Sequence, residues 1–291
     1  MKDSITTVLY NRQMAPGYYC MGIAAPGYPQ LARPGQFVMV RVNQSYDPLL
    51  RRPFGIFRTG TEELSHSEME SQDYMEVVYK VVGRGTRLMS HLVAGDEVGL
   101  LGPLGQGFCI SPDAGGAMRD AVLVGGGIGV VPLFMLAQQL VARGVKVHLL
   151  LGGRNCGDIL ALAEFERLGV KTSIATDDGT LGEKCFVTQL LQATLQKFPA
   201  VQVFACGPTP MLHAVQQICA AAGAELQVSL EATMACGVGA CLGCVVEGRN
   251  HSEQQPEYLC TCKQGPVFDA HELAWTQEAL GPVLTPAEDS L

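Results

Sequence analysis

Short hydrophobic runs rich in β-branched and aromatic residues, separated by glycine and proline, fill roughly the first 110 residues. The strongest are Phe37–Val42, Met75–Val82 and Glu97–Leu101. Such runs are typical of short antiparallel strands, so we expect an N-terminal β-barrel whose last strand ends at Gly102-Pro103. Thr59–Tyr74 holds five acidic residues and no Lys or Arg, and we expect it to form an exposed hairpin loop.

Strand-like runs begin to alternate with helical ones near Gly115. The strand-like runs start at Ala121, Val145, Val170 and Val201. Between the first two, apolar residues recur at helical spacing, at Leu133, Leu136, Ala137, Leu140 and Val141. We expect Asp158 to cap a helix that ends at Leu168, and a last helix over Met211–Ala222. The alternation predicts a doubly wound parallel sheet.

From about Leu226 the chain is rich in glycine and cysteine and shows no helical periodicity as far as Ala270. The sequence therefore predicts an α+β multi-domain protein with three units. We place an antiparallel β-barrel at 1–112, an α/β domain at 113–225 and a small cysteine-rich domain at 226–291.

Composition narrows the function classes. The 291 residues are 47% hydrophobic and 16% charged, which excludes a mainly disordered chain. The net charge of −8 disfavours nucleic acid and anionic membranes as partners, because both attract a basic surface. The uncharged stretch 121–142 resembles a transmembrane helix in length and hydrophobicity. Its glycines are placed where we expect a strand to turn into a helix, so we do not expect this stretch to span a membrane. The first residues lack the apolar core of a signal peptide, and we expect a cytoplasmic protein.

Five of the eleven cysteines crowd near the C-terminus. Cys236, Cys241 and Cys244 form a C-x4-C-x2-C run, with Cys260 and Cys262 downstream. Three thiolates in a tight loop and one distant thiolate are typical of a plant-type 2Fe–2S cluster. The interleaved glycines would let the loop bend and bring its N–H groups to the cluster sulfurs. The alternative is a structural zinc site, which more often has two C-x2-C pairs.

A glycine-rich turn follows the first strand of the predicted sheet, and its glycines are Gly125, Gly126, Gly127 and Gly129. Where a strand turns into a helix in this way, backbone N–H groups can bind a pyrophosphate at the positive end of the helix dipole. Pro132 replaces the third glycine of G-x-G-x-x-G. A tight turn without a ligand is therefore the alternative.

Two more turns fall at the carboxyl ends of predicted strands. Asp177 and Asp178 follow the third strand, where carboxylates accept hydrogen bonds from ribose hydroxyls and repel a 2′-phosphate. This favours NAD over NADP, although a helix-entry aspartate would look the same. Cys206 and Gly207 follow the fourth strand at the same edge of the sheet.

The barrel carries a second phosphate-binding pattern. Arg52 could hold a phosphate bidentately, and Gly85 and Thr86 begin a short predicted helix whose free N–H groups could bind the rest of a pyrophosphate. An ordinary surface arginine and turn would explain the same residues.

Taken in order over nearly the whole chain, these motifs resemble the ferredoxin–NADP reductase superfamily, and within it the electron transfer subunits of dihydroorotate dehydrogenase B. The motifs are LLRRPFGIF, YKVVGRGT, GPLGQGF, LVGGGIGVVPL, TDDG, ACGPTPM, SLEATMACGVGACLGC and CKQGPVFDA. The resemblance implies FAD binding by Arg52, Pro53, Phe54, Gly55, Val78, Tyr79, Lys80, Gly85 and Thr86, and NAD binding by the GGGIG turn. It implies cluster binding by Cys236, Cys241, Cys244 and Cys262.

Two positions qualify this resemblance. Gly55 departs from the small hydroxyl residue usual in the family, so its N–H could still reach the flavin while a side-chain contact would be missing. Cys260 is then not needed as a cluster ligand, although it lies close to Cys262 in the sequence. Which of Cys260 and Cys262 is the fourth ligand stays open.

The resemblance also implies a mechanism. NAD(H) exchanges a hydride with FAD, and single electrons pass through the 2Fe–2S cluster to FMN in a separate catalytic subunit that oxidises dihydroorotate to orotate in pyrimidine biosynthesis. No catalytic side chains are expected, because cofactors carry the chemistry. The family forms a heterotetramer of two plus two subunits. The alternatives are a reductase for another acceptor (a ferredoxin, a sulfur species or an oxygenase) and a non-redox zinc protein.

Overall fold

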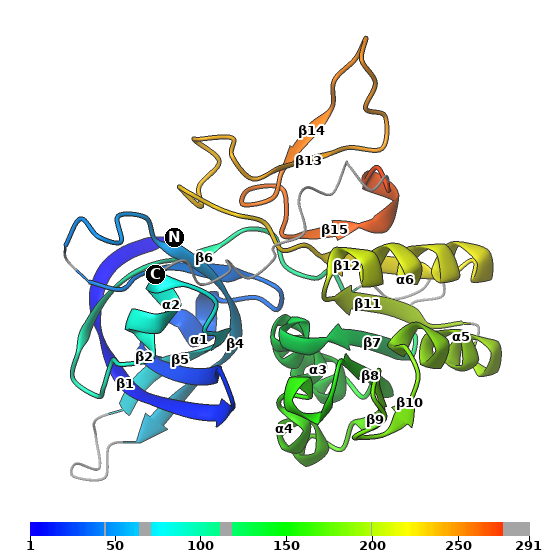
Figure 1. The fold of residues 1–291 in the computed structure, drawn as a ribbon, viewed down its shortest axis with the longest axis horizontal. Helices are drawn as coiled ribbons and strands as arrows, with labels where there is room; N and C mark the ends of the chain where they lie inside the picture. The colour runs from blue at the N-terminus through cyan, green and yellow to red at the C-terminus, as the bar shows by residue number, and fades with distance from the viewer. Residues whose placement is uncertain (44, 64–70, 111–117, 199, 276–291) are drawn as a thin grey trace.

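The computed structural model describes residues 1–43, 45–63, 71–110, 118–198 and 200–275. Within these ranges the strands form a closed barrel, a seven-stranded sheet and a two-stranded sheet. Figure 1 shows the barrel and the large sheet side by side, with a small C-terminal module above them. The predicted α+β architecture is confirmed.

The barrel closes in the order β1-β2-β5-β4-β3-β6, and each neighbouring pair for which a register is given is antiparallel. Its strands are β1 (Lys2–Ala15), β2 (Tyr18–Ala24), β3 (Phe37–Arg41), β4 (Arg52–Glu63), β5 (Ser71–Lys80) and β6 (Glu97–Leu104). Two short helices, α1 (Tyr28–Leu31) and α2 (Arg84–Met89), lie between strands. Buried side chains such as Met21, Ile56 and Val77 form the barrel core, as the strand patterns predict.

Two expectations for the barrel were wrong in detail. Strand β6 continues through Gly102-Pro103 to Leu104, because a register shift in its pairing with β3 accommodates the proline. In the acidic stretch, β4 reaches Glu63 and β5 starts at Ser71, so both ends of the expected loop are paired strands. Polar residues on both faces of such a ribbon leave no hydrophobic pattern to detect. Residues 64–70 lie outside the described part.

The large sheet has the order β10-β9-β8-β7-β11-β12-β15. Six strands run parallel, and the last pairs antiparallel with β12. The strands are β7 (Ala121–Gly126), β8 (Val147–Gly153), β9 (Lys171–Thr176), β10 (Glu183–Lys184), β11 (Gln202–Cys206), β12 (Glu225–Ser229) and β15 (Val267–Asp269). The helices are η1 (Gly127–Val130), α3 (Val131–Ala142), η2 (Cys156–Asp158), α4 (Leu162–Arg167), α5 (Val187–Lys197) and α6 (Thr209–Ala222).

Helices cover both faces of this sheet, because its strands are apolar on both sides. Residues of α3 and α4 pack with Leu123 and Leu149, whereas residues of α5 and α6 pack with Val122 and Leu150. The expected cap at Asp158 is wrong: α4 begins at Leu162, and Asp158 faces other partners described below.

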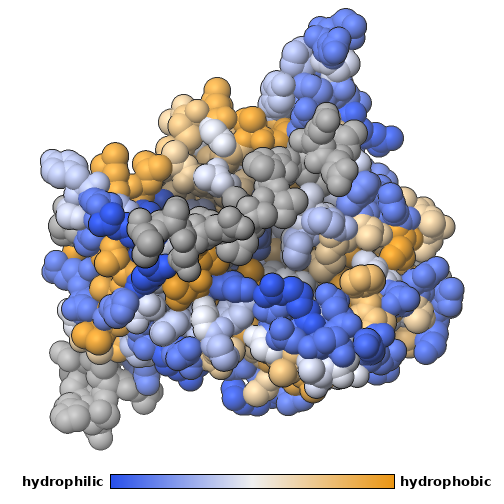
Figure 2. Space-filling view, viewed as in Figure 1, coloured by the Kyte–Doolittle hydropathy of each residue, from blue (hydrophilic) through white to orange (hydrophobic). Residues whose placement is uncertain are grey.

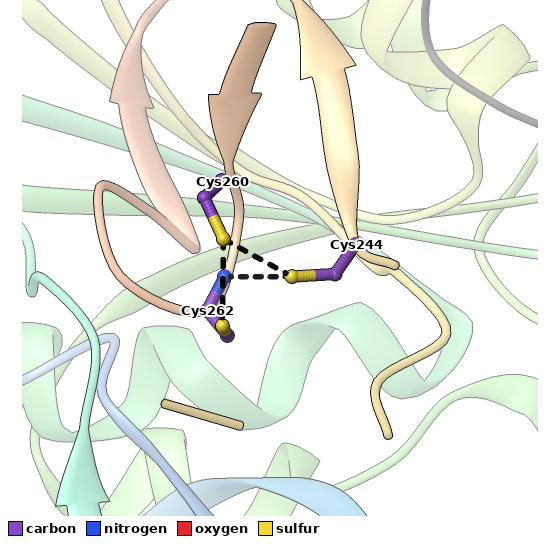
Figure 3. Close-up of side chains that lie close together, drawn as sticks. All are labelled: Cys244, Cys260 and Cys262. Atoms are coloured by element: carbon purple, nitrogen blue, oxygen red, sulfur yellow. Dashed lines mark hydrogen bonds between the residues drawn. The ribbon is translucent and has the colours of Figure 1, made fainter. Parts of the chain in front are cut away.

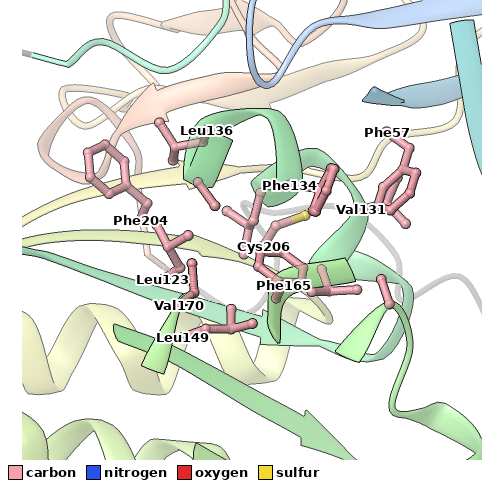
Figure 4. Close-up of a cluster of buried hydrophobic side chains, with 14 of the residues drawn as sticks. Phe57, Leu123, Val131, Phe134, Leu136, Leu149, Phe165, Val170, Phe204 and Cys206 are labelled. Atoms are coloured by element: carbon pink, nitrogen blue, oxygen red, sulfur yellow. The ribbon is translucent and has the colours of Figure 1, made fainter. Parts of the chain in front are cut away.

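The barrel and the sheet share one hydrophobic core. Phe57 of β4 stacks on Phe134 of α3 with ring centroids 4.6 Å apart, and Phe134 meets Phe165 of α4 edge-on at 5.1 Å. Figure 4 shows these rings among the sheet residues. Contact also runs the other way, because Met135 of α3 packs among the residues of the barrel core. Close packing of buried rings across this contact holds the two domains in a fixed relative position.

The C-terminal module is a small hairpin built onto the sheet. Strands β13 (Val245–Glu247) and β14 (Tyr258–Cys260) pair antiparallel, and η3 (Ala270–Glu272) follows β15. Strand β12 extends the α/β sheet past the predicted boundary at 225, and β15 adds to the same sheet from the cysteine-rich segment. No helix among the described residues has the length and apolar character needed to cross a membrane. The uncharged stretch 121–142 divides into β7, η1 and α3.

Candidate cofactor sites

Three buried thiols converge at the base of the C-terminal hairpin. The sulfur atoms of Cys244, Cys260 and Cys262 lie within 4.8 Å of one another. Figure 3 shows the three side chains pointing toward one another. Cys244 precedes β13, and Cys260 ends β14, so the hairpin pairing itself brings them together. The Cys260 sulfur is 3.6 Å from the sulfurs of both Cys244 and Cys262.

The other two cysteines of the run form a pair of their own. Cys241 hydrogen-bonds to Cys236, and the N–H of Val238 donates to the Cys236 sulfur at 3.4 Å. The loop that carries this pair reaches the group of three thiols where the Gly239 N–H donates to the Cys262 sulfur at 3.0 Å. The structure thus brings Cys244 and Cys262 together with Cys260, and holds Cys236 and Cys241 as a separate pair in the adjoining loop. Five cysteines in one small module are enough for a two-iron cluster, which takes four thiolates.

Charge explains why this set calls for a metal. Burial and the neighbouring thiols raise the pKa of Cys262, and burial also raises that of Cys244. At Cys236, N–H donors outweigh burial and lower the pKa to about 6. Crowded thiols cannot all ionise without a cation, and a bound metal supplies that compensating charge. The donor set therefore fits a cluster.

The cysteine loop rests directly on the barrel. Gly237 has a φ of 73°, and a Cβ there would come within 2.5 Å of the Met39 side chain. Met39 lies on β3 and is the register partner of Pro53 on β4. Only glycine allows this approach. The loop is thus one strand away from the Arg52–Gly55 motif.

The predicted FAD residues gather at one end of the barrel. Arg52 and Gly85 touch, so closely that a Cβ at Gly85 would overlap the Arg52 guanidinium. The Thr86 hydroxyl accepts from the Val82 N–H at 3.0 Å and donates to the Gly83 carbonyl at 3.1 Å, which orders the start of α2. Helix starts leave N–H groups without intrahelical partners. An arginine beside such a start fits a pyrophosphate.

The remaining FAD candidates line the neighbouring strands. Val78 and Tyr79 are buried at the end of β5, where the Tyr79 hydroxyl donates to Asn11 Oδ1 at 3.0 Å. The Phe54 ring lies 5.8 Å from the Tyr79 ring. Lys80 ends β5 and faces the α/β domain.

The glycine turn and the Cys206-Gly207 turn touch at the carboxyl edge of the sheet. Strands β7 and β11 pair with Gly125 opposite Cys206. A Cβ at Gly129 would overlap the Cys206 carbonyl, and one at Gly207 would lie 3.1 Å from the Gly126 Cα. The structure therefore packs the glycine turn and the Cys206-Gly207 turn against each other, with no space for side chains at Gly129 or Gly207.

Asp177 and Asp178 differ in whether their carboxylates accept hydrogen bonds. Asp178 accepts hydrogen bonds from the Thr180 N–H and hydroxyl at 2.9 and 2.7 Å, which lower its pKa. Its carboxylate is thus engaged in the turn. The Asp177 carboxylate has no hydrogen bond within the described part of the chain and lies near Arg154. Sequence reasoning missed Arg154, although its place directly after the second predicted strand could have marked it.

A closed antiparallel barrel joined to a doubly wound sheet, with a glycine-containing turn on each and a cysteine-rich module docked on the barrel, is the architecture of a ferredoxin-reductase-like iron–sulfur oxidoreductase. Family models agree: residues 231–274 match the iron–sulfur cluster binding domain of dihydroorotate dehydrogenase B, and residues 123–217 match the oxidoreductase NAD-binding domain. The chain belongs to the family of electron transfer subunits of NAD(+)-dependent dihydroorotate dehydrogenase B.

Relatives of that name support this assignment over almost the full length. The protein from Desulforamulus reducens is 37% identical over 92% of this chain and 97% of its own. The proteins from Bacillus pumilus and Fusobacterium nucleatum are 36% and 34% identical, each over 94% of this chain and 99% of its own.

Solved structures share the fold. An NADH-dependent reduced ferredoxin-NADP oxidoreductase superposes with a TM-score of 0.76 at 24% identity, over 94% of this chain and 90% of its own. A ferredoxin NADP+ reductase from Neisseria gonorrhoeae, with bound FAD and NADP, gives 0.60 at 15% identity over 77% of this chain and 92% of its own.

Proposed function

We propose that this chain passes electrons between NAD and an FMN-containing catalytic subunit that oxidises dihydroorotate to orotate, with flow toward NAD⁺. The observation that carries the proposal is the position of β4. Its Gly55 lies against Pro132 beside the nucleotide turn, while its Pro53 pairs with Met39 under the cysteine loop. The strand that carries the FAD motif thus contacts the helix that follows the nucleotide turn, and it pairs with the strand on which the cysteine loop rests.

The residues divide the task of holding three cofactors. Arg52, Gly85 and Thr86 bind the FAD pyrophosphate, and the Gly125–Gly129 turn with Cys206-Gly207 binds that of NAD. Cys236, Cys241, Cys244 and Cys262 hold the cluster, and the Gly239 N–H donated to the Cys262 sulfur supports Cys262 over Cys260. When bound, FAD supplies hydride and single-electron chemistry and the 2Fe–2S cluster carries single electrons.

The cysteine loop also supports a docking edge for the catalytic subunit. Cys241 is exposed, and its neighbour Leu242 is 64% exposed, with Val238 nearby in the loop. Figure 2 shows apolar surface over this module beside the hydrophilic tip of the β13–β14 hairpin. Apolar side chains around a redox centre suit a partner that must approach closely. We propose a complex of two electron transfer and two catalytic subunits.

We place this complex in the cytoplasm. All eleven cysteines lie within the described ranges, and none of them is paired in a disulfide there, which is typical of a reducing compartment.

The test is anaerobic, dihydroorotate-dependent NAD⁺ reduction by the source organism's dihydroorotate-oxidising subunit, with and without this chain. NADH formed only when the chain is present is the expected result. If no NADH forms, yet NADH still bleaches the flavin of this chain, the acceptor is a different one and the proposed partner is rejected.

A further inference from the structure

Asp158 joins the two large domains through charged and polar contacts. Its Oδ1 accepts a hydrogen bond from the Tyr18 hydroxyl at 2.7 Å and lies 3.8 Å from Lys80 Nζ. Tyr18 and Lys80 are register partners on β2 and β5, and the Lys80 ammonium also stands 4.8 Å from the centre of the Tyr18 ring. Asp158 is only 7% exposed. Its carboxylate is therefore held in place from the barrel side.

From the other side, the same carboxylate binds Arg154. Arg154 Nε donates to Oδ2 at 2.8 Å and Nη2 donates to Oδ1 at 3.3 Å, which is a bidentate pair. The Arg154 side chain itself is 69% exposed. A long, exposed side chain would otherwise sample many rotamers, so the fixed carboxylate decides where the guanidinium lies.

The place of Arg154 in the sheet makes this pairing relevant to the nucleotide. Arg154 directly follows β8, and Gly152 of β8 is the register partner of Gly126 in the nucleotide turn. In doubly wound dinucleotide folds the residues beyond the second strand meet the adenosine ribose, and an arginine there accommodates a 2′-phosphate. This chain thus carries an arginine suited to NADP, although its relatives are named for NAD(+).

We propose that Asp158 is a specificity-determining residue: it holds the Arg154 guanidinium in an ion pair and so keeps it from a 2′-phosphate. The pair has no net charge, and the Nε/Nη2 edge of the guanidinium, one of its two bidentate edges, is occupied by the carboxylate. Asp177, close to Arg154, adds a negative charge to the same edge. The inference rests on the NAD site proposed above.

The test measures binding of adenosine 2′,5′-bisphosphate and adenosine 5′-monophosphate to the full chain by calorimetry, since these differ only in the 2′-phosphate. Asp158→Asn should tighten the bisphosphate about tenfold relative to the monophosphate, because a charged guanidinium is released. Arg154→Gln combined with Asp158→Asn should abolish that gain. Tyr18→Phe, which removes a barrel contact but keeps the ion pair, should leave the ratio unchanged.

Three outcomes would overturn the inference. First, if the wild type binds the bisphosphate more tightly than the monophosphate, Arg154 is already free to bind a 2′-phosphate. This measurement does not depend on any variant folding. An unchanged ratio in a folded Asp158→Asn variant would show that the pair does not restrain Arg154. Failure of the wild type to bind either nucleotide would reject the nucleotide site itself, and with it the proposed function.

Discussion

Gly55 of β4 lies against Pro132 of α3, and a Cβ at Gly55 would stand 3.8 Å from the proline Cβ. That distance is an ordinary van der Waals contact. The proposed flavin strand and the helix after the nucleotide turn therefore abut, with room for one small side chain at Gly55. The barrel can accept the hydroxyl residue that the resemblance leads one to expect there.

Gly55→Ser should bind FAD more tightly, by roughly threefold to tenfold, because a hydroxyl adds one hydrogen bond at a position that can hold it. Flavin fluorescence during titration of the apoprotein measures the Kd. Gly55→Ala is the matched control, since it adds the Cβ without the hydroxyl. Equal affinities of the serine and alanine variants would contradict a hydrogen bond to the flavin.

Cys241→Ser and Cys262→Ser should lose the cluster while keeping FAD, because each removes one thiolate of a four-thiolate set. Cys260→Ser should keep its iron, since the Gly239 N–H donates to the sulfur of Cys262. Iron content per flavin and the visible spectrum give the answer. A Cys260→Ser protein without iron, beside an iron-containing Cys262→Ser protein, would exchange the two roles.

Asp177→Ala should raise use of NADPH relative to NADH by roughly fivefold in kcat/KM, because it removes a charge that repels the 2′-phosphate. Asp178→Ala should leave the ratio near that of the wild type, since its carboxylate is bound to Thr180. The ratio of the two kcat/KM values with ferricyanide as acceptor is the measurement. A larger change at Asp178 than at Asp177 would reverse the assignment.

Burial raises the pKa of Asp158, but the hydrogen bonds from Arg154 and Tyr18 outweigh it and lower the pKa from 3.8 to about 2. A lowered pKa stabilises the fold above the unfolded value near 3.8, and the contribution fades as the pH falls from there toward 2. Between pH 6 and 3 the chain should lose about 1 kcal/mol of unfolding free energy from this group.

The comparison that isolates this contribution is with Asp158→Asn, which cannot titrate. The difference in unfolding free energy between the wild type and this variant, from urea titrations, should shrink by that amount as the pH falls from 6 to 3. A difference that stays constant with pH would mean that the pKa of Asp158 is the same in the folded and the unfolded chain.

Hydrophobic periodicity was sufficient to predict the helices that bury one face and the strands that are buried entirely. Helix α3 was predicted from Leu133, Leu136 and Leu140, and these residues are buried against the sheet. Strand β15 was missed, because three residues, Val267–Asp269, are too few for a pattern, and the sheet edge that accepts them lies far away in sequence.

The candidate site residues were also predictable only where the signal lies within a few adjacent residues. Motifs contained in one turn, such as the cysteine loop and the glycine turn, could be read from adjacent residues. Asp158 could not, because a carboxylate near a helix looks like a cap until the fold supplies Tyr18 and Lys80 from a different domain. The contact of Gly237 with Met39 was equally invisible, since it depends on how the module docks.

Strand β15 closes one edge of the seven-stranded sheet by pairing with Gln227, Val228 and Ser229 of β12. An uncovered edge strand offers its N–H and C=O groups to other chains and promotes aggregation. A truncated protein that ends before residue 267 would therefore expose β12 and self-associate, even with an intact barrel and nucleotide turn. The cysteine-rich segment thus also covers the edge strand β12, and deleting it would lower solubility as well as abolish electron transfer.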